Sequence, residues 1–205
     1  MERTIVRLND AHKQAATATL TAAFMDDPAM CWMLRGDANR ARRLPRLIAW
    51  MFDDHLRHGM VLGTPGCEVV TMWRPPGSVH DHAPLTPPAL VRFVKILGRG
   101  VLRAERADRM IGHHLPKGEG QFYLRMAGVR PDRQGQGLGG LAIRAGLAEA
   151  DAAHLPSVLE TATQNNVGLY RSLGFDVIDT WRVARDGPVF WTMTRPAPFS
   201  QGHQG

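Results

Sequence analysis

The sequence predicts a mixed α/β fold in one domain. Segments with helical and with strand-like spacing of hydrophobic residues alternate along the chain. The 205 residues suffice for one hydrophobic core, and 44% of them are hydrophobic against 21% charged, a balance typical of globular proteins. No internal repeat is visible.

The first half of the chain is expected to contain three helices and three strands. Its strands are predicted at 4–8, 60–62 and 67–73, and its helices at 11–24, 39–58 and 90–111. Asn9 or Asp10 is suited to cap the first helix, and Gly59 to end the second. Residues 78–88 are predicted to form a loop, and the third helix is expected to turn Phe93, Val94, Leu97, Val101 and Leu102 to the core.

The second half is more regular. Strands are predicted at 121–129, 158–161, 175–183 and 188–194, and helices at 137–154 and 167–173. Asp186-Gly187 between the last two strands is a strong hairpin signal. Residues 196–205 are expected to be a flexible tail.

Charge and cysteine content narrow the classes of function. The net charge is +6, but the arginines are scattered, so a nucleic-acid partner is disfavoured and a phosphate-bearing small molecule is allowed. Cys31 and Cys67 form no metal or disulfide pattern, which favours a reducing cytoplasm. The sequence shows neither a signal peptide nor an apolar run near the ~20 residues of a membrane span, so no membrane association is expected.

The most informative segment is the glycine-rich stretch from Gly128 to Gly140, between an expected strand and an expected helix. Its backbone amides from Gln134 to Gly139 can converge at the positive end of the helix dipole, an arrangement that suits a pyrophosphate. Arg130 and Arg133 can add positive charge at the rim. The spacing matches neither the dinucleotide fingerprint nor the P-loop.

Two motifs then resemble a known family. Gln134-x-x-Gly137-x-Gly139, after a strand that ends in Val129 and is followed by Pro131, is similar to the acyl-CoA pyrophosphate loop of the GNAT superfamily of N-acyltransferases. Downstream, the segment 166–175 resembles the family's Asn…Tyr-x-x-x-Gly-Phe pattern. Asn166 precedes Tyr170 by four residues, whereas seven separate the pair in many members.

The resemblance implies a fold, a division of the chain and a reaction. The fold is a central mixed, mostly antiparallel twisted sheet, split at the cofactor strand, with helices on both faces. Residues 1–195 would form one N-acetyltransferase domain, with an acceptor-side half at 1–118 and an acetyl-CoA-binding half at 119–195. The implied enzyme moves an acetyl group from acetyl-CoA to a primary amine of a small molecule or peptide, by direct transfer in a ternary complex, as a monomer or homodimer.

The resemblance also assigns roles to residues. Those expected to bind acetyl-CoA are Ala127, Gly128, Val129, Gln134, Gly135, Gln136, Gly137, Leu138, Gly139, Asn166 and Tyr170. Tyr170 is the candidate acid for the departing thiolate, and Glu160, on the strand expected to face the site, is the candidate base. His113 and His114 compete for the role of base, and Trp32 is a candidate for the acceptor pocket.

Two alternatives to this reaction stay open at this point. The domain could be an acyl-CoA-binding sensor without turnover, or it could acetylate aminoacyl-tRNA. The pairs His55-x-x-His58 and His80-x-His82 invite a metal interpretation, but no further ligands with suitable spacing follow and acyl transfer requires no metal, so no metal is expected.

Overall fold

The structure is a computed structural model, and it describes residues 4–77, 87–117 and 120–198. Its seven strands form one sheet in the order β1-β2-β3-β4-β5-β7-β6. The strands are β1 (Val6–Arg7), β2 (Met60–Gly63), β3 (Val69–Arg74), β4 (Phe122–Val129), β5 (Ser157–Thr161), β6 (Asp176–Arg182) and β7 (Val189–Arg195). Neighbours are antiparallel except β4 and β5, which are parallel. The predicted fold class is confirmed.

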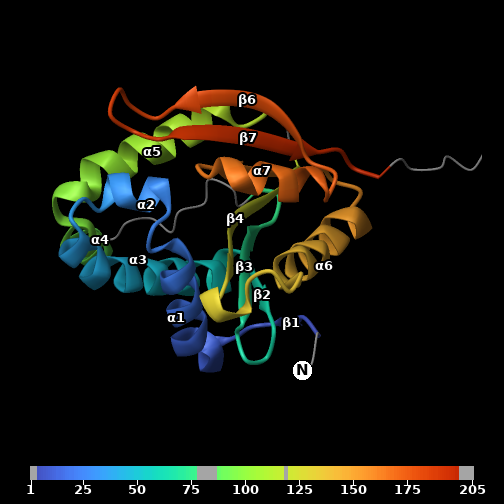
Figure 1. Cartoon of the computed structure of the whole chain (residues 1–205), viewed down its shortest axis with the longest axis horizontal. Coiled ribbons are helices and arrows are strands. Elements are labelled where there is room, and N and C mark those ends of the chain that lie inside the picture. The colour runs from blue at the N-terminus through green and yellow to red at the C-terminus, as the bar shows by residue number, and fades with distance from the viewer. Residues whose placement is uncertain (1–3, 78–86, 118–119, 199–205) are drawn as a thin grey trace, which may run out of the picture.

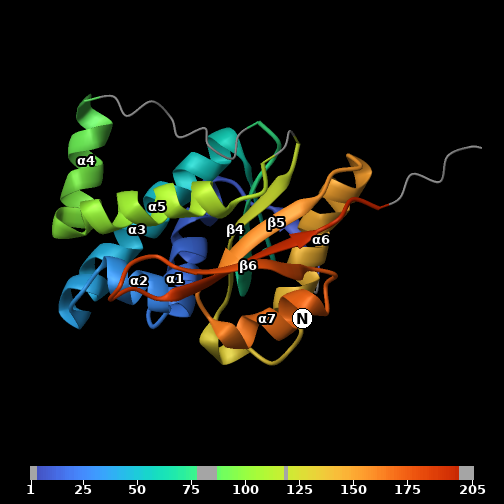
Figure 2. The same cartoon turned by 90° about the horizontal axis from the view of Figure 1, so that it is seen from above.

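Helices cover both faces of the sheet (Figures 1 and 2). They are α1 (Lys13–Phe24), α2 (Pro28–Met33), α3 (Asp37–His58), α4 (Pro87–Leu97), α5 (Val101–His114), α6 (Leu138–Ala152) and α7 (Gln164–Arg171). Met72 packs into the core under α1 and α3, whereas the next residue, Trp73, packs into the core under α6. A Cβ on Gly146 of α6 would lie 2.2 Å from the Trp73 ring, so this glycine lets the helix approach the sheet closely.

Most predicted elements exist with shifted ends. Asn9 caps a short 3-10 helix (Asp10–His12) that leads into α1, and Gly59 ends α3 as predicted. The strand expected from residue 67 starts at Val69, because Cys67 has φ +54° and belongs to the preceding turn. The helix expected at 167–173 starts three residues earlier, at Gln164.

The prediction of one continuous helix at 90–111 is wrong. A 3-10 turn (Gly98–Gly100) separates α4 from α5. Gly98 has φ +53°, a conformation that ends a helix at little cost only for glycine. The Arg43 guanidinium from α3 donates to the carbonyl of Ile96 at 2.7 Å and satisfies the exposed end of α4. Because the two helices take different directions, Val94 and Leu102 are exposed, contrary to expectation.

Helix α2 is absent from the prediction, because a proline shortly after an apolar helical segment is typical of the end of a helix. In the structure Pro28 occupies the first helical position, where proline is well tolerated. Asp27 caps the helix by accepting hydrogen bonds from the amides of Ala29 and Met30 at 3.0 Å. The predicted loop at 78–88 lies outside the described residues except for Pro87 and Pro88, which begin α4, and of the predicted tail only 196–198 is described.

Candidate active site

The sheet opens between its two parallel strands. β4 and β5 pair only over Phe122–Leu124 and Ser157–Leu159. Beyond this point β4 continues along β3 to Val129, whereas β5 continues along β7 to Thr161. The split predicted at the cofactor strand is therefore present, and Ala127, Gly128 and Val129 lie on the part of β4 that has no pairing with β5.

The glycine-rich loop follows directly from β4 and leads into α6. Gly135 and Gly137 have φ +73° and +78°, and no atom lies within 4 Å of where their Cβ atoms would be. The first closing hydrogen bond of α6 runs from the Leu141 amide to the Gly137 carbonyl, at 3.1 Å. The amides of Leu138, Gly139 and Gly140 precede it, so they have no acceptor within the helix and are available to an anion.

Side chains around this loop hold it against the sheet. Gln134 donates from Nε2 to the carbonyl of Val129 at 3.3 Å, so its side chain folds back on the end of β4. Arg130 lies at the rim and pairs with Asp132 at 2.7 Å. The predicted phosphate-binding segment is thus a structured turn with a surface that no side chain fills at Gly135 or Gly137.

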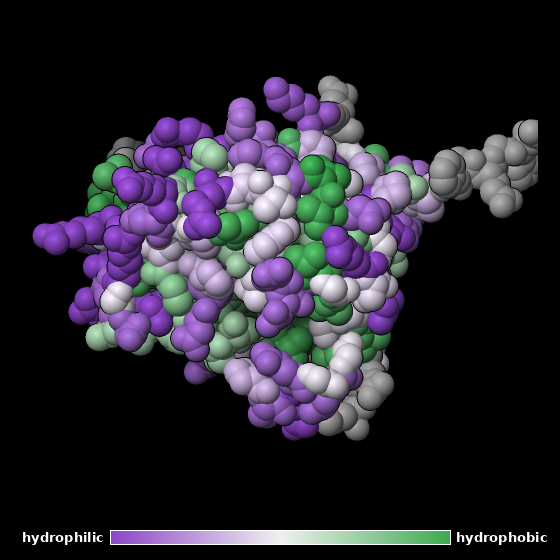
Figure 3. Space-filling model, turned by 45° about the horizontal axis from the view of Figure 1, so that its top comes forward, coloured by the Kyte–Doolittle hydropathy of each residue, from purple (hydrophilic) through white to green (hydrophobic). Residues whose placement is uncertain are grey.

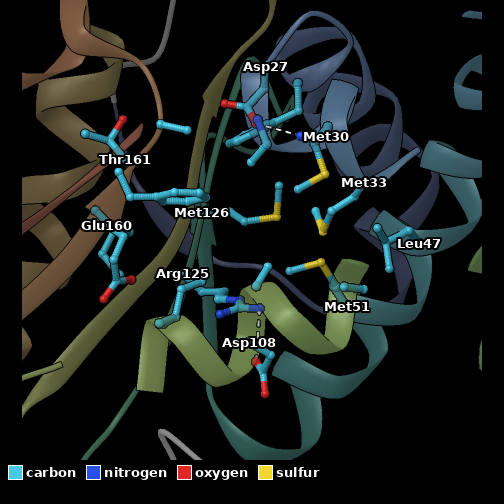
Figure 4. A pocket seen from close by; sticks show the side chains of 18 of the residues that line it. Asp27, Met30, Met33, Leu47, Met51, Asp108, Arg125, Met126, Glu160 and Thr161 are labelled. Carbon is cyan, nitrogen blue, oxygen red and sulfur yellow. Dashed lines mark hydrogen bonds and ion pairs between the residues drawn. The ribbon is translucent and has the colours of Figure 1, made fainter. Parts of the chain in front are cut away.

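A cavity of about 340 Å³ lies beside the opening. It extends from Ala127, Asn166 and Tyr170 past Glu160 to the inner sides of α2, α3 and α5. The structure thus brings together the two predicted catalytic residues, Glu160 and Tyr170, and three of the predicted cofactor residues, Ala127, Asn166 and again Tyr170; the other predicted cofactor residues do not line this cavity. Figure 4 shows Glu160 and Thr161 approaching from β5, whereas Met30, Met33 and Met51 approach from α2 and α3.

Glu160 is a cavity residue whose pKa is shifted towards neutral pH. Both of its carboxylate oxygens are buried, and neither makes a hydrogen bond with a residue in the described part of the chain. Burial raises its pKa to about 7, while the nearby Tyr123 hydroxyl and Arg125 guanidinium offset part of that effect. A carboxylate with such a pKa is suited to accept a proton near neutral pH.

A polar cluster behind Glu160 escaped the sequence analysis. Arg125 donates to the Tyr123 hydroxyl at 3.0 Å and lies 3.7 Å from the Asp108 carboxylate of α5. β4 has a register shift here, since Trp73 pairs with Leu124 and Met72 with Met126. Arg125 is the extra residue of this β-bulge, so it lines the cavity beside Met126. A bulge leaves no signal in hydrophobic periodicity.

Tyr170 is buried in α7 and packs edge-on against Phe175, with ring centroids 6.1 Å apart. Burial, with a smaller contribution from the negative charge of Asp27, raises its pKa to about 12. Its hydroxyl therefore stays protonated at neutral pH and can act as a donor. Burial also raises the pKa of Asp27, a cavity residue that the sequence analysis did not select.

Three other predicted candidates do not line the cavity. His114 stacks on Trp181, with ring centroids 4.5 Å apart, and its Nδ1 lies 2.6 Å from Asp179, while His113 packs beside it. Trp32 donates from its indole to Asp186 at 3.3 Å. Helix α2 instead contributes Ala29, Met30 and Met33 to the wall.

The metal interpretation of the histidine pairs gains no support. His55 is buried in α3, with Nδ1 2.7 Å from the Met51 carbonyl. Within residues 4–77, 87–117 and 120–198, no group of three or more His, Cys, Asp or Glu side chains is arranged to hold a metal ion. His80 and His82 lie outside the described residues. In the described part, no helix is long and apolar enough to cross a membrane.

Comparisons with known proteins agree with this geometry. The family model of the acetyltransferase (GNAT) domain matches residues 96–196. Among solved structures, "histone acetyltransferase HPA2 and related acetyltransferase" from Corynebacterium glutamicum superposes with a TM-score of 0.74 at 20% identity, over 97% of this chain and 98% of that chain. Arylalkylamine N-acetyltransferase 2 from Aedes aegypti gives 0.61 at 12% identity, over 95% and 99%.

A third structure, the ribosomal-protein-S18-alanine N-acetyltransferase from Escherichia coli, gives a TM-score of 0.56 at 16% identity, over 98% of each chain. At these identities the structural neighbours support the fold alone. The split sheet, the glycine loop and the matched domain define an acyltransferase of the class that uses acetyl-CoA. Residues 96–196 match the acetyltransferase (GNAT) domain, and the fold of the chain agrees with that match.

Proposed function

We propose that the chain is an N-acetyltransferase that moves an acetyl group from acetyl-CoA to a primary amine of a small molecule or peptide within a ternary complex. One observation carries the proposal. The strand that ends at the glycine loop, β4, also forms the wall of a cavity that contains a buried carboxylate, Glu160, and a buried phenol, Tyr170.

The residues present fit acetyl-CoA. The diphosphate would accept hydrogen bonds from the amides of Leu138, Gly139 and Gly140, next to the open surface of Gly135 and Gly137. The pantetheine arm would run along Ala127, Gly128 and Val129, where β4 has no pairing with β5. Gln134 contributes by holding the loop on Val129, and Gln136 by its place in the turn. When bound, acetyl-CoA supplies an activated thioester.

Glu160 would take the proton that the attacking amine must lose. A free alkylamine is protonated at neutral pH and is not nucleophilic in that form. A buried carboxylate with a pKa of about 7 is available as a base at the pH at which the reaction runs. The neighbouring Arg125 tunes this group, because its positive charge favours the ionised carboxylate.

Tyr170 would donate a hydrogen bond, and then its proton, to the sulfur that leaves. Its raised pKa keeps the phenol in the donor form at every pH at which amines react. Asn166, one turn earlier on α7, lines the same cavity and would contact the pantetheine arm. Direct transfer agrees with these roles, because both proton-transferring groups line one cavity.

The proposal is tested by calorimetry with CoA and acetyl-CoA, and by CoA thiol release against a panel of amines, amino acids, polyamines and peptides. We expect binding of CoA, and thiol release that depends on the amine. Binding without release across the whole panel would favour the acyl-CoA sensor instead. If the folded protein bound neither CoA nor acetyl-CoA, the proposed function would be wrong.

A further inference from the structure

The part of the cavity that lies away from the glycine loop is lined mainly by methionine and aromatic side chains. Four methionines contribute to the wall, namely Met30, Met33, Met51 and Met126. Figure 4 shows them gathered between α2, α3 and β4. Trp50 of α3 and Phe93 of α4 close the far side, with ring centroids 5.1 Å apart. We call this region the methionine chamber.

A chamber of this composition fits an aromatic ring better than a flexible polar chain. Thioether sulfurs make favourable contacts with the edges of aromatic rings, and unbranched methionines adapt their shape to the ring that enters. Trp50 and Phe93 add faces and edges for ring packing. Much of the outer surface is hydrophilic (Figure 3), whereas methionine and aromatic side chains form most of the wall of this region.

The charged residues that line the cavity indicate a second property of the acceptor, its charge. Its lining includes two arginines and five carboxylates, namely Asp27, Asp54, Glu105, Asp108 and Glu160. Asp54 is bonded to Arg74, Asp108 is paired with Arg125, and Glu105 with Arg109. Asp27 is engaged by the amides at the start of α2. Both oxygens of Glu160 are buried and without a hydrogen bond in the described chain, and the nearby Arg125 guanidinium is shared with Asp108, so a further cationic group is favoured beside Glu160.

These two features occur in one cavity, with Glu160 on the side of β5 and the methionine chamber on the side of α2 and α3 (Figure 4). We infer that the acceptor is an arylalkylamine, whose ammonium group binds at Glu160 and whose aromatic ring occupies the methionine chamber. This inference rests on the proposed function and names its substrate class.

The test compares 2-phenylethylamine with ethylamine as acceptors, with acetyl-CoA as donor and thiol release as readout. The two amines share the reacting group, and only the first has a ring to bury. We expect kcat/KM to be at least about tenfold higher for 2-phenylethylamine. Trp50→Ala should lower that ratio by about tenfold, and Trp50→Phe should restore most of it. Trp191→Ala, a partly buried tryptophan that does not line the cavity, should leave the ratio as it is.

The outcomes separate the inference from the proposed function. If ethylamine or a peptide were acetylated as fast as 2-phenylethylamine, the inference would be wrong and the proposed function would stand. Faster reaction of octanoyl-CoA than of acetyl-CoA, lost in Trp50→Ala, would assign the chamber to the acyl chain and overturn the inference. If no amine released thiol, the inference would be tested by calorimetry of 2-phenylethylamine binding to the CoA-bound protein. Heat that disappears in Trp50→Ala supports the inference, and no heat overturns it.

Discussion

Replacing Glu160 with glutamine should make the folded protein more stable at alkaline pH. Burial raises the pKa of Glu160 from its ordinary 4.5 to about 7. Between these values the folded state holds a proton that the unfolded state has released, so the contribution of this group to stability falls as pH rises. The difference, about 7 minus 4.5, corresponds to about 3 kcal/mol at about 1.36 kcal/mol per pH unit. Glutamine does not ionise, and its side chain has nearly the same shape as that of glutamate.

The assay is urea unfolding followed by tryptophan fluorescence, for both proteins, from pH 5 to pH 8.5. The free energy of unfolding of Glu160→Gln minus that of the wild type should grow by about 2 to 3 kcal/mol over this range. Other titrating groups are common to both proteins and cancel in the difference. Glu149→Gln is the matched control, because that glutamate pairs with Arg7 at the surface and its removal should cost under about 1 kcal/mol.

A difference that stays flat between pH 5 and pH 8.5 would refute the reasoning, since it would mean that ionising Glu160 carries no cost in the folded protein. A difference that grows with pH would also support a functional role for Glu160. A buried carboxylate that destabilises the fold above its pKa is the kind of strained group that active sites retain.

Three further predictions follow from the same geometry. Tyr170→Phe should lower kcat by about 10- to 1,000-fold while calorimetry finds unchanged CoA affinity; equal kcat would remove Tyr170 from the acid role. Gly137→Val should weaken CoA binding, measured by calorimetry, because φ +78° is strained for a β-branched residue; unchanged affinity would contradict the loop assignment. The pH profile of kcat/KM should rise with an apparent pKa of about 7 that Glu160→Gln abolishes; a rise that persists in the variant would assign the base elsewhere.

The glycine loop and the regular elements of the second half could be predicted from the sequence because their signals are local. A strand that ends in glycines before an apolar helix defines the loop within a dozen residues. Tyr170 and Glu160 were selected because the resemblance assigned their elements, and the structure places both on one cavity. The roles given to them remain predictions.

The errors have different physical causes. Helix α1 ends at Phe24, and Pro28 begins α2 with Asp27 as its cap. An Asp before a Pro is a local signal for a helix start, which the prediction leaves out. The helical spacing of apolar residues runs through Gly98 without interruption, so it does not indicate the break, which the contact of Arg43 with the end of α4 stabilises. Trp32 is aromatic and early in the chain, but its indole bonds to Asp186 in the distant hairpin.

The bulge at Arg125 is the feature that connects the sheet to the chemistry. In a regular strand, successive side chains point to opposite faces, so Arg125 and Met126 would lie on different sides of β4. The extra residue lets both line the cavity. Arg125 then supports the ionised form of Glu160, while Met126 joins the methionine chamber. One irregularity thus places a polar wall and an apolar wall side by side, and an amine attached to an apolar body requires both.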